Sequence, residues 1–306
     1  SLEGDVENNG TLIFNQAEDY TWANAITGSG NVVKQDANTL TLGGNHTYTG
    51  DSELKAGTTL VAQGATLGAT GNTATLTVDS GATFASAGTV NQNLLVASGG
   101  TLAAWNAISG NTLSSTGAAS TGDTINGNVT NQGTLLLASA SNTAGNNFVI
   151  DGDYTGAQGS TIVMNTVVGD DSSLTDHLAI TGNSAGTSSV AVANVGGMGA
   201  QTLNGIEVIG VGGSSDAVFT LDKPVVAGAW EYNLNQHTDG NWYLESAAKQ
   251  PDPDNGGNTP EIYRPEVGVY MANYVAAQQM FQHKRDDRDQ VMLRDEDDLN
   301  TWMYVK

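Results

Sequence analysis

The sequence has no cysteine among its 306 residues and few basic residues. The absence of cysteine excludes thiol catalysis, cysteine-ligated zinc and disulfide cross-links. It also suits a chain that crosses a membrane unfolded, because an early disulfide would close a loop too bulky for a narrow pore. Ten Lys and Arg stand against 32 Asp and Glu, so the formal net charge is −22. Such acidity argues against nucleic acid and anionic lipid as partners and predicts a self-repelling surface.

Aromatic residues are also scarce, at 6% of the chain, whereas glycine accounts for 39 residues. The hydrophobic share of 39% is still enough for a packed core, so this composition does not indicate disorder. No charged stretch followed by an apolar run opens the chain, so no signal peptide is expected at residues 1–4. Because the repeat pattern is already under way there, we expect a fragment of a longer protein.

Patterns typical of catalysis are missing. The chain has neither G-x-x-x-x-G-K nor G-x-S-x-G, and its four histidines lie in separate segments without metal-ligand spacing. Asp176 and His177 lie near Ser172 and Ser173, but neighbours on one strand point to opposite faces, which argues against a triad. We therefore expect no enzyme activity and no cofactor.

Several acidic stretches were weighed as metal sites. Asp151 with Asp153, and Asp170 with Asp171, could offer carboxylates to Ca²⁺. Residues 252–257 resemble the start of a calcium loop, but the twelfth position is Tyr263 rather than the Glu that such a loop requires. We expect no metal site, and we interpret Thr and Asn recurring at equivalent positions as hydrogen-bonded ladders.

Residues 1–150 repeat a short theme, in which a small turn residue precedes a strand of alternating apolar and small polar residues. It recurs at residues 10–14, 57–61, 74–78, 81–85, 100–104 and 133–137. Successive turn glycines, such as Gly57 and Gly81, lie about 19 to 24 residues apart, which predicts a solenoid of stacked rungs. The expected fold is all-β, a right-handed parallel β-helix of about 11 rungs. A β-sandwich, with strands every 8–12 residues or so, is the competing architecture.

The end of the β-rich region concentrates aromatic residues. Residues 225–234 and 239–245 predict a β-hairpin with a primed turn at Asp239-Gly240. A solenoid must cover its last rung or expose an adhesive edge, so we predict that this hairpin is the cap. The predicted cap side chains are Trp230, Tyr232, Trp242, Tyr243 and Leu244.

A linker and one helix are predicted to follow. Residues 247–260 hold three of the five prolines. In residues 261–290, Pro265 suits a first helical turn, Glu266 suits its positive end, and apolar residues recur at the helical period. The 20-residue run from Glu266 to Arg285 would be about 30 Å long, equal to a bilayer core, yet Asn273 and nearby Gln residues exclude a lipid-facing span.

Two stretches resemble Gram-negative autotransporter passengers. The run Thr39-Leu-Thr-Leu-Gly-Gly-Asn-His-Thr-Tyr-Thr-Gly50, within residues 30–60, resembles the strand repeat of that family. Residues 148–246 resemble its pertactin-like autochaperone region. The cues for the second resemblance are Asp176-x-Leu178, residues 211–216, residues 226–228 and residues 240–244. The resemblance covers most of residues 30–60 and 150–306.

The resemblance implies a domain order. It consists of a stem at 1–147, an autochaperone cap at 148–246, a linker at 247–260, a pore helix at 261–290 and the start of a truncated translocator barrel at 291–306. In this family the helix lies inside the barrel, which would explain its polar residues. The implied pore-helix residues are Tyr263, Arg264, Pro265, Glu266, Tyr270, Asn273 and Phe281.

The resemblance also implies a function. The chain would be the stem and autochaperone of a surface adhesin or aggregation factor, folding from its C-terminal end outside the cell. Implied partners are its own translocator barrel, the outer-membrane assembly machinery and an unidentified surface receptor. The implied location is the Gram-negative outer membrane, with release after any cleavage. Two alternatives stay open: a stem carrying an upstream serine protease or lipase, and a carbohydrate-binding β-sandwich module.

Overall fold

The computed structural model describes residues 4–111 and 123–248. These belong to one compact unit, Ser1–Lys249, and the chain's second unit is Gln250–Lys306. The predicted pore helix and barrel start lie outside the described residues, as does the linker from residue 249 onward. Within the described ranges, no helix is long and apolar enough to span a membrane. The 3-10 helix η1 (Trp105–Ala107) is the one helix of these ranges.

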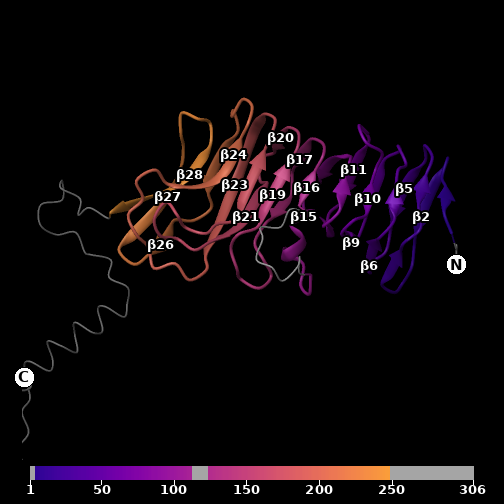
Figure 1. Cartoon of the computed structure of the whole chain (residues 1–306), viewed down its shortest axis with the longest axis horizontal. Coiled ribbons are helices and arrows are strands. Elements are labelled where there is room, and N and C mark those ends of the chain that lie inside the picture. The colour runs from indigo at the N-terminus through magenta and orange to yellow at the C-terminus, as the bar shows by residue number, and fades with distance from the viewer. Residues whose placement is uncertain (1–3, 112–122, 249–306) are drawn as a thin grey trace, which may run out of the picture. The chain divides into compact units, whose positions relative to one another are not determined.

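Parallel strands stack in three columns, here called the first, second and third faces, and successive coils add strands to each of them (Figure 1). The first face holds β2 (Thr11–Phe14), β5 (Asn31–Lys34), β8 (Ser52–Leu54), β11 (Thr75–Val78), β14 (Asn93–Val96), β17 (Val129–Asn131), β20 (Tyr154–Gly156) and the start of β23 (Ser184–Asn194). The second face holds β3 (Tyr20–Trp22), β6 (Thr39–Leu42), β9 (Gly57–Val61), β12 (Ala82–Ser86), β15 (Thr101–Ala103), β18 (Thr134–Leu136), β21 (Thr161–Thr166), the rest of β23 and β25 (Val218–Leu221).

The third face is narrower along most of its length. It holds β7 (Asn45–His46), β10 (Thr66–Leu67), β13 (Thr89–Val90), β16 (Thr124–Ile125), β19 (Asn147–Ile150), β22 (His177–Ile180) and β24 (Ile206–Val211). Two earlier strands, β1 (Val6–Glu7) and β4 (Ile26–Thr27), form a separate parallel pair. This coil-on-coil parallel pairing is that of a β-helix, and it differs from the antiparallel sheets of the β-sandwich weighed as an alternative.

Strand alternation builds the core, because every second residue of a strand points inward. On the third face, the register places His46 beside Leu67, and Leu67 beside Val90. The column continues through Ile125 and Ile150, all of them buried. A histidine therefore begins a ladder of aliphatic side chains. Matching columns on the other two faces meet it inside the coil and form one hydrophobic core.

Coil length varies along the chain, and the later coils are longer than the earlier ones. Equivalent positions are 20 residues apart at Asn31 and Asp51, but 35 apart at Asn93 and Asn128 and 30 apart between Asp153 and Asn183. The predicted period of 19–24 residues therefore holds only in the earlier coils. The later coils have longer loops and therefore contain more residues each. The chain consequently forms fewer rungs than a constant period predicts, and the expected count of about 11 rungs is too high. Eight strands stack on the first face.

The long strand β23 crosses the corner between the first and second faces. It pairs with β20 at its start and with β21 over its second half. Gly186 allows this bend with a φ of +80°, and a Cβ there would overlap the carbonyl oxygen of Gly156. Only glycine combines this left-handed conformation with such close approach of two backbones.

Candidate functional site

The direction of strand pairing reverses at the C-terminal end of the coil stack. One edge of β24 pairs in parallel with β22, and the other pairs antiparallel with β28 (Trp242–Ala248). Strand β28 then pairs antiparallel with β27 (Trp230–Gln236), and β27 pairs with β26 (Val225–Ala227). Figure 1 shows these last strands in orange beyond β24. The predicted hairpin is present, and it continues the third face past the last coil.

The turn of this hairpin differs from the primed turn expected at Asp239-Gly240. The N–H of Gly240 donates to the carbonyl oxygen of His237 at 3.0 Å, and the N–H of His237 donates to that of Asn241 at 2.9 Å. Gly240 has a φ of +88°, whereas Asp239 does not adopt a positive φ. A primed type I turn requires positive φ at both central residues. The loop is instead a three-residue connection with a left-handed glycine at its end.

Three predicted cap side chains point into the end of the core. Tyr232 and Leu244 are fully buried, and Trp242 is 7% exposed. Trp242 packs edge-on against Phe219 of β25, with ring centroids 5.3 Å apart, and Phe219 in turn lies 5.9 Å from Tyr154. This aromatic row joins the hairpin to the last strand of the second face and to β20 on the first. Burial of such large apolar surfaces is the main favourable term in sheet packing.

Tyr232 also binds backbone groups of two loops. Its hydroxyl oxygen lies 2.7 Å from the carbonyl oxygen of Gly169 and 3.0 Å from that of Ala200, and it accepts the N–H of Ala200 at 2.9 Å. Burial raises the pKa of this hydroxyl, so it stays protonated and able to donate. The residue therefore links the hairpin to the loop after β21 and the loop after β23.

The other two predicted cap side chains lie differently. Trp230 is half-buried and packs against the outside of the hydrophobic core. Tyr243 points outward and stacks on His237 with centroids 4.1 Å apart. Its hydroxyl oxygen lies 2.7 Å from a carboxylate oxygen of Asp239 and 3.0 Å from one of Glu207. Burial and the carboxylate of Asp239 raise the pKa of Tyr243. It therefore supports the outer surface of the hairpin rather than the core.

A hydrogen-bonded ladder of Asn and Asp follows the corner before the first face. In each rung, a side-chain oxygen accepts the backbone N–H of the equivalent residue one coil later. The rungs join Asn31 to Asp51, Asp51 to Thr75, Asn93 to Asn128, Asn128 to Asp153, Asp153 to Asn183 and Asn183 to Ser214, at 2.7–2.9 Å. The expected ladders of polar residues are thus present, and they satisfy N–H groups at the coil corners.

The acidic residues weighed as metal ligands are engaged as hydrogen-bond acceptors. Asp151 accepts the hydroxyl of Thr181 at 2.8 Å. Asp170 accepts the hydroxyl and N–H of Ser172, and Asp171 accepts the N–H groups of residues 203–205. Within 4–111 and 123–248, no three His, Asp or Glu side chains form a group suited to a metal ion.

The Asp176–His177–Ser172 combination does not form a triad. Asp176 is fully buried and binds backbone N–H groups, whereas the His177 ring faces Glu207 with Nε2 and Oε1 3.0 Å apart. The Ser172 hydroxyl donates to Asp170 at 2.6 Å. The three side chains therefore serve separate contacts.

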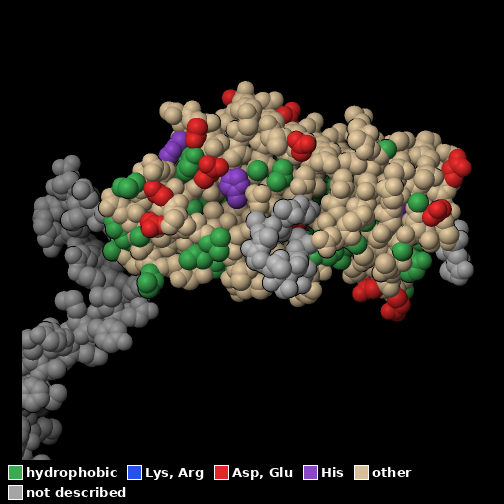
Figure 2. All heavy atoms as spheres, viewed as in Figure 1, with side chains coloured by type: hydrophobic (Ala, Val, Ile, Leu, Met, Phe, Trp, Pro, Cys, Tyr) green, Lys and Arg blue, Asp and Glu red, His purple; other side chains and the backbone are tan. Residues whose placement is uncertain are grey.

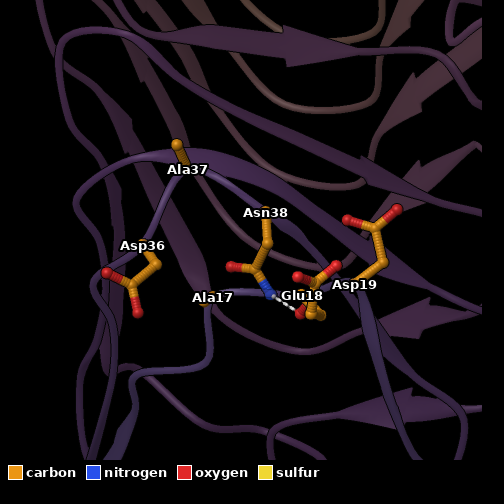
Figure 3. A pocket seen from close by; sticks show the side chains of 6 residues that line it. All are labelled: Ala17, Glu18, Asp19, Asp36, Ala37 and Asn38. Atoms are coloured by element: carbon orange, nitrogen blue, oxygen red, sulfur yellow. Dashed lines mark hydrogen bonds between the residues drawn. The ribbon is translucent and has the colours of Figure 1, made fainter.

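A shallow hollow lies on the early coils, far along the stack from the hairpin. It is lined by Ala17, Glu18, Asp19, Asp36, Ala37 and Asn38 (Figure 3). The Asn38 amide donates to the carbonyl oxygen of Glu18 at 2.6 Å, and Asp19 accepts the N–H of Thr39 at 2.7 Å. These contacts again join successive coils. Elsewhere, Asp and Glu side chains are scattered over the visible face rather than gathered in one patch (Figure 2).

The comparisons with known proteins agree with this geometry. The family described as Autochaperone Domain Type 1 matches residues 124–234, which end within β27. The protein YuaQ of Escherichia coli (strain K12) is 36% identical over 293 residues, covering 92% of this chain and 18% of YuaQ. The adhesin BmaC autotransporter of Brucella suis biovar 1 (strain 1330) is 34% identical, covering 83% of this chain and 9% of BmaC. The autotransporter adhesin AIDA-I of Escherichia coli is 33% identical, covering 59% and 16%.

A parallel coil stack that ends in an antiparallel hairpin and matches an autochaperone domain defines a secreted passenger. The chain belongs to the Gram-negative autotransporters and is a passenger segment with a type 1 autochaperone region. Its location is accordingly the cell surface, at the outer membrane. The chain spans less than a fifth of the length of each of these three relatives.

Proposed function

We propose that residues 148–246 fold first and serve as the template on which the coils of residues 1–147 assemble outside the cell. The observation that carries this proposal is the reversal at β24. Its outer edge is occupied by β28, so new parallel coils cannot add there. At the opposite end, within the described residues, β2 and β3 each pair on one side only. On the third face, coils can therefore add only at the end away from the hairpin, toward the N-terminus.

Templating follows from the energetics of stacked coils. An isolated coil has few internal contacts, since its strands pair with the coils above and below rather than with each other. Its ordering entropy is offset only when a folded neighbour supplies both a ladder of hydrogen bonds and an apolar surface. The hairpin, whose strands are adjacent in sequence, closes a short loop at lower entropic cost. It is thus the natural first element.

The whole protein, in this proposal, is a surface adhesin rather than an enzyme. Two of its relatives, BmaC and AIDA-I, are named adhesins. The implied partners are its own translocator domain, the outer-membrane assembly machinery and a surface receptor. The pore helix at 261–290, with the residues named for it above, would join the passenger to that translocator domain.

The order of folding is the test. The full chain is refolded from denaturant, labelled with short pulses of deuterium and analysed by mass spectrometry of its peptides. We expect amides of β22, β24 and β28 to gain protection first, and amides of β5 and β8 last. If the early coils gained protection before the hairpin, or all coils gained it together, the template role would be refuted.

A further inference from the structure

A buried carboxylate lies where three segments of the matched autochaperone domain, residues 124–234, meet. Asp176, the residue before β22, has no exposed surface. One of its oxygens accepts the N–H groups of Gly145 and Asn146, both at 2.9 Å, and the other accepts the N–H of Asn165 at 2.7 Å. The ion pairs of the described residues do not include it. Its negative charge is held by backbone N–H groups alone.

The partners of Asp176 hold the same junction together. The Asn165 carbonyl oxygen accepts the N–H of Asp176, and the Asn146 carbonyl oxygen accepts the N–H of His177. The Asn146 amide donates to the carbonyl oxygen of Leu137 at 2.7 Å, and the Asn165 amide donates to that of Thr143 at 3.1 Å. The carboxylate thus ties the start of β22 to the segment before β19 and to β21.

The register of β22 on β19 is poorly determined by apolar residues alone. In the observed pairing, Phe148 lies beside Leu178 and Ile150 lies beside Ile180. A shift of two residues would place Phe148 beside Ile180, with apolar side chains still inward, because strand side chains alternate with a period of two. The loops before both strands belong to the longer coils, so a regular repeat does not restrict the shift either.

Only one register supplies Asp176 with its three N–H donors. A shift of two residues would move the carboxylate away from Gly145 and Asn146 while leaving it in the core. A buried charge without hydrogen bonds is strongly unfavourable, so shifted pairings are selectively destabilised. The same contacts stabilise the native pairing, since bonds to a charged acceptor are stronger than neutral ones.

We propose that Asp176 is a positioning residue that selects the register of β22 on β19 as the autochaperone region folds. This inference rests on the proposed template function, because an error at this step would be copied into every coil added later. In this proposal one carboxylate fixes a strand register that the apolar pattern alone does not determine.

Cysteine cross-linking measures the register directly, because the natural chain has no cysteine. Val149 lies beside Ala179 in the native pairing, and both are half-buried. A Val149→Cys, Ala179→Cys chain reports the native register, and a Val149→Cys, Thr181→Cys chain reports a two-residue shift. In each, Asp176 is kept, or replaced by Asn or Leu, and the full chain is refolded and oxidised.

We expect Asp176→Leu to lower the native cross-link at least threefold and to raise the shifted one. Asp176→Asn should have a smaller effect, because its oxygen can still accept from Gly145 and Asn146 while its amide opposes the N–H of Asn165. Asp171→Asn is the matched control, since Asp171 also accepts three backbone N–H groups but is only partly buried, in the loop between β21 and β22.

Refolding rates provide a second readout, which remains informative if Asp176→Leu does not fold. Asp176→Asn should slow refolding about tenfold and change the unfolding rate little. Unchanged cross-linking in the Leu chain, or faster unfolding with normal refolding in the Asn chain, would overturn the positioning role. The pulse-labelling order tests the template role separately, because C-terminal coils could form first whether or not Asp176 selects their register.

Discussion

Trp242 in the hairpin and Phe219 in the last strand of the second face pack edge to face, with ring centroids 5.3 Å apart and planes at 90°. Through this contact the antiparallel hairpin packs against the interior of the parallel stack. Both side chains are almost fully buried. The pair therefore joins the hairpin strand β28 to β25, the last strand of the second face.

We expect Trp242→Ala to destabilise the terminal coils by about 3–5 kcal/mol, because it leaves a large cavity beside Phe219. The measurement is urea unfolding of the full chain, with limited proteolysis of the stem. Trp230→Ala is the matched control, and its smaller effect follows from its half-buried position. Equal losses in the two chains would show that the interior contact has no special role. Surface display should fall in the same order.

Tyr232→Phe should cost about 1–3 kcal/mol, since it leaves buried backbone groups of Gly169 and Ala200 without their partner. Tyr243→Phe serves as the control, because its hydroxyl binds two carboxylates at a partly exposed position. Thermal unfolding distinguishes the two. A Tyr232→Phe chain as stable as the parent would mean that water replaces the hydroxyl at no cost.

Stability of the early coils should fall in acid because of His46. Burial lowers the pKa of this histidine from 6.5 to about 4. Its Nε2 accepts the N–H of Gly44, which a protonated ring could not do. Since the unfolded chain binds the proton first, the stability contributed by neutral His46 is complete above pH 6.5. It is lost as the pH falls toward 4, by about 3 kcal/mol at about 1.4 kcal/mol for each pH unit.

The comparison is between the parent chain and His46→Leu, by urea unfolding at pH 7.5 and 4.5. The substitution should flatten the pH dependence. Burial also raises the pKa of Asp176 to about 6, so its contribution increases as the pH falls. That opposing effect is present in both chains and cancels in the difference. Parallel pH profiles would contradict the role given to His46.

The corner ladder predicts a modest and local effect. Asn128→Ala removes the acceptor of the Asp153 N–H, which lies 2.9 Å away, and should destabilise the chain by about 1 kcal/mol. Thr155→Ala, at an exposed strand position one coil later, is the control. Hydrogen exchange should speed up at Asp153 and remain unchanged two coils away. Exchange rates that rise along the entire corner would indicate that the rungs act as one cooperative unit instead.

Local pattern was sufficient to predict the solenoid and the hairpin. The alternation in residues such as Leu76 and Val78 points alternate side chains inward, and both are fully buried. The turn type was missed because Asp239-Gly240 has the composition of a primed turn, while the chain places Gly240 after the turn. The number of coils was missed because loop length does not follow from strand pattern, and the stretch between Asn93 and Asn128 extends one coil to 35 residues.

The role of Asp176 could not be predicted from neighbouring residues. Its immediate surroundings in sequence are polar and read as a surface turn. Its burial depends on N–H groups of Gly145, Asn146 and Asn165, which reach it only after the coils stack. His46 gave no stronger signal, because β6 ends at Leu42 and residues 43 and 44 form a corner before β7 begins.

The growth in coil length has a consequence for how far the passenger extends from the cell. A coil advances the stack by one strand spacing, ~4.8 Å, whether it contains 20 residues or 31. Reach is therefore set by the number of coils, and loops can lengthen without moving what lies beyond them. Sequence can be inserted between β15 and β16 to diversify the surface, while a change in height requires a whole additional coil.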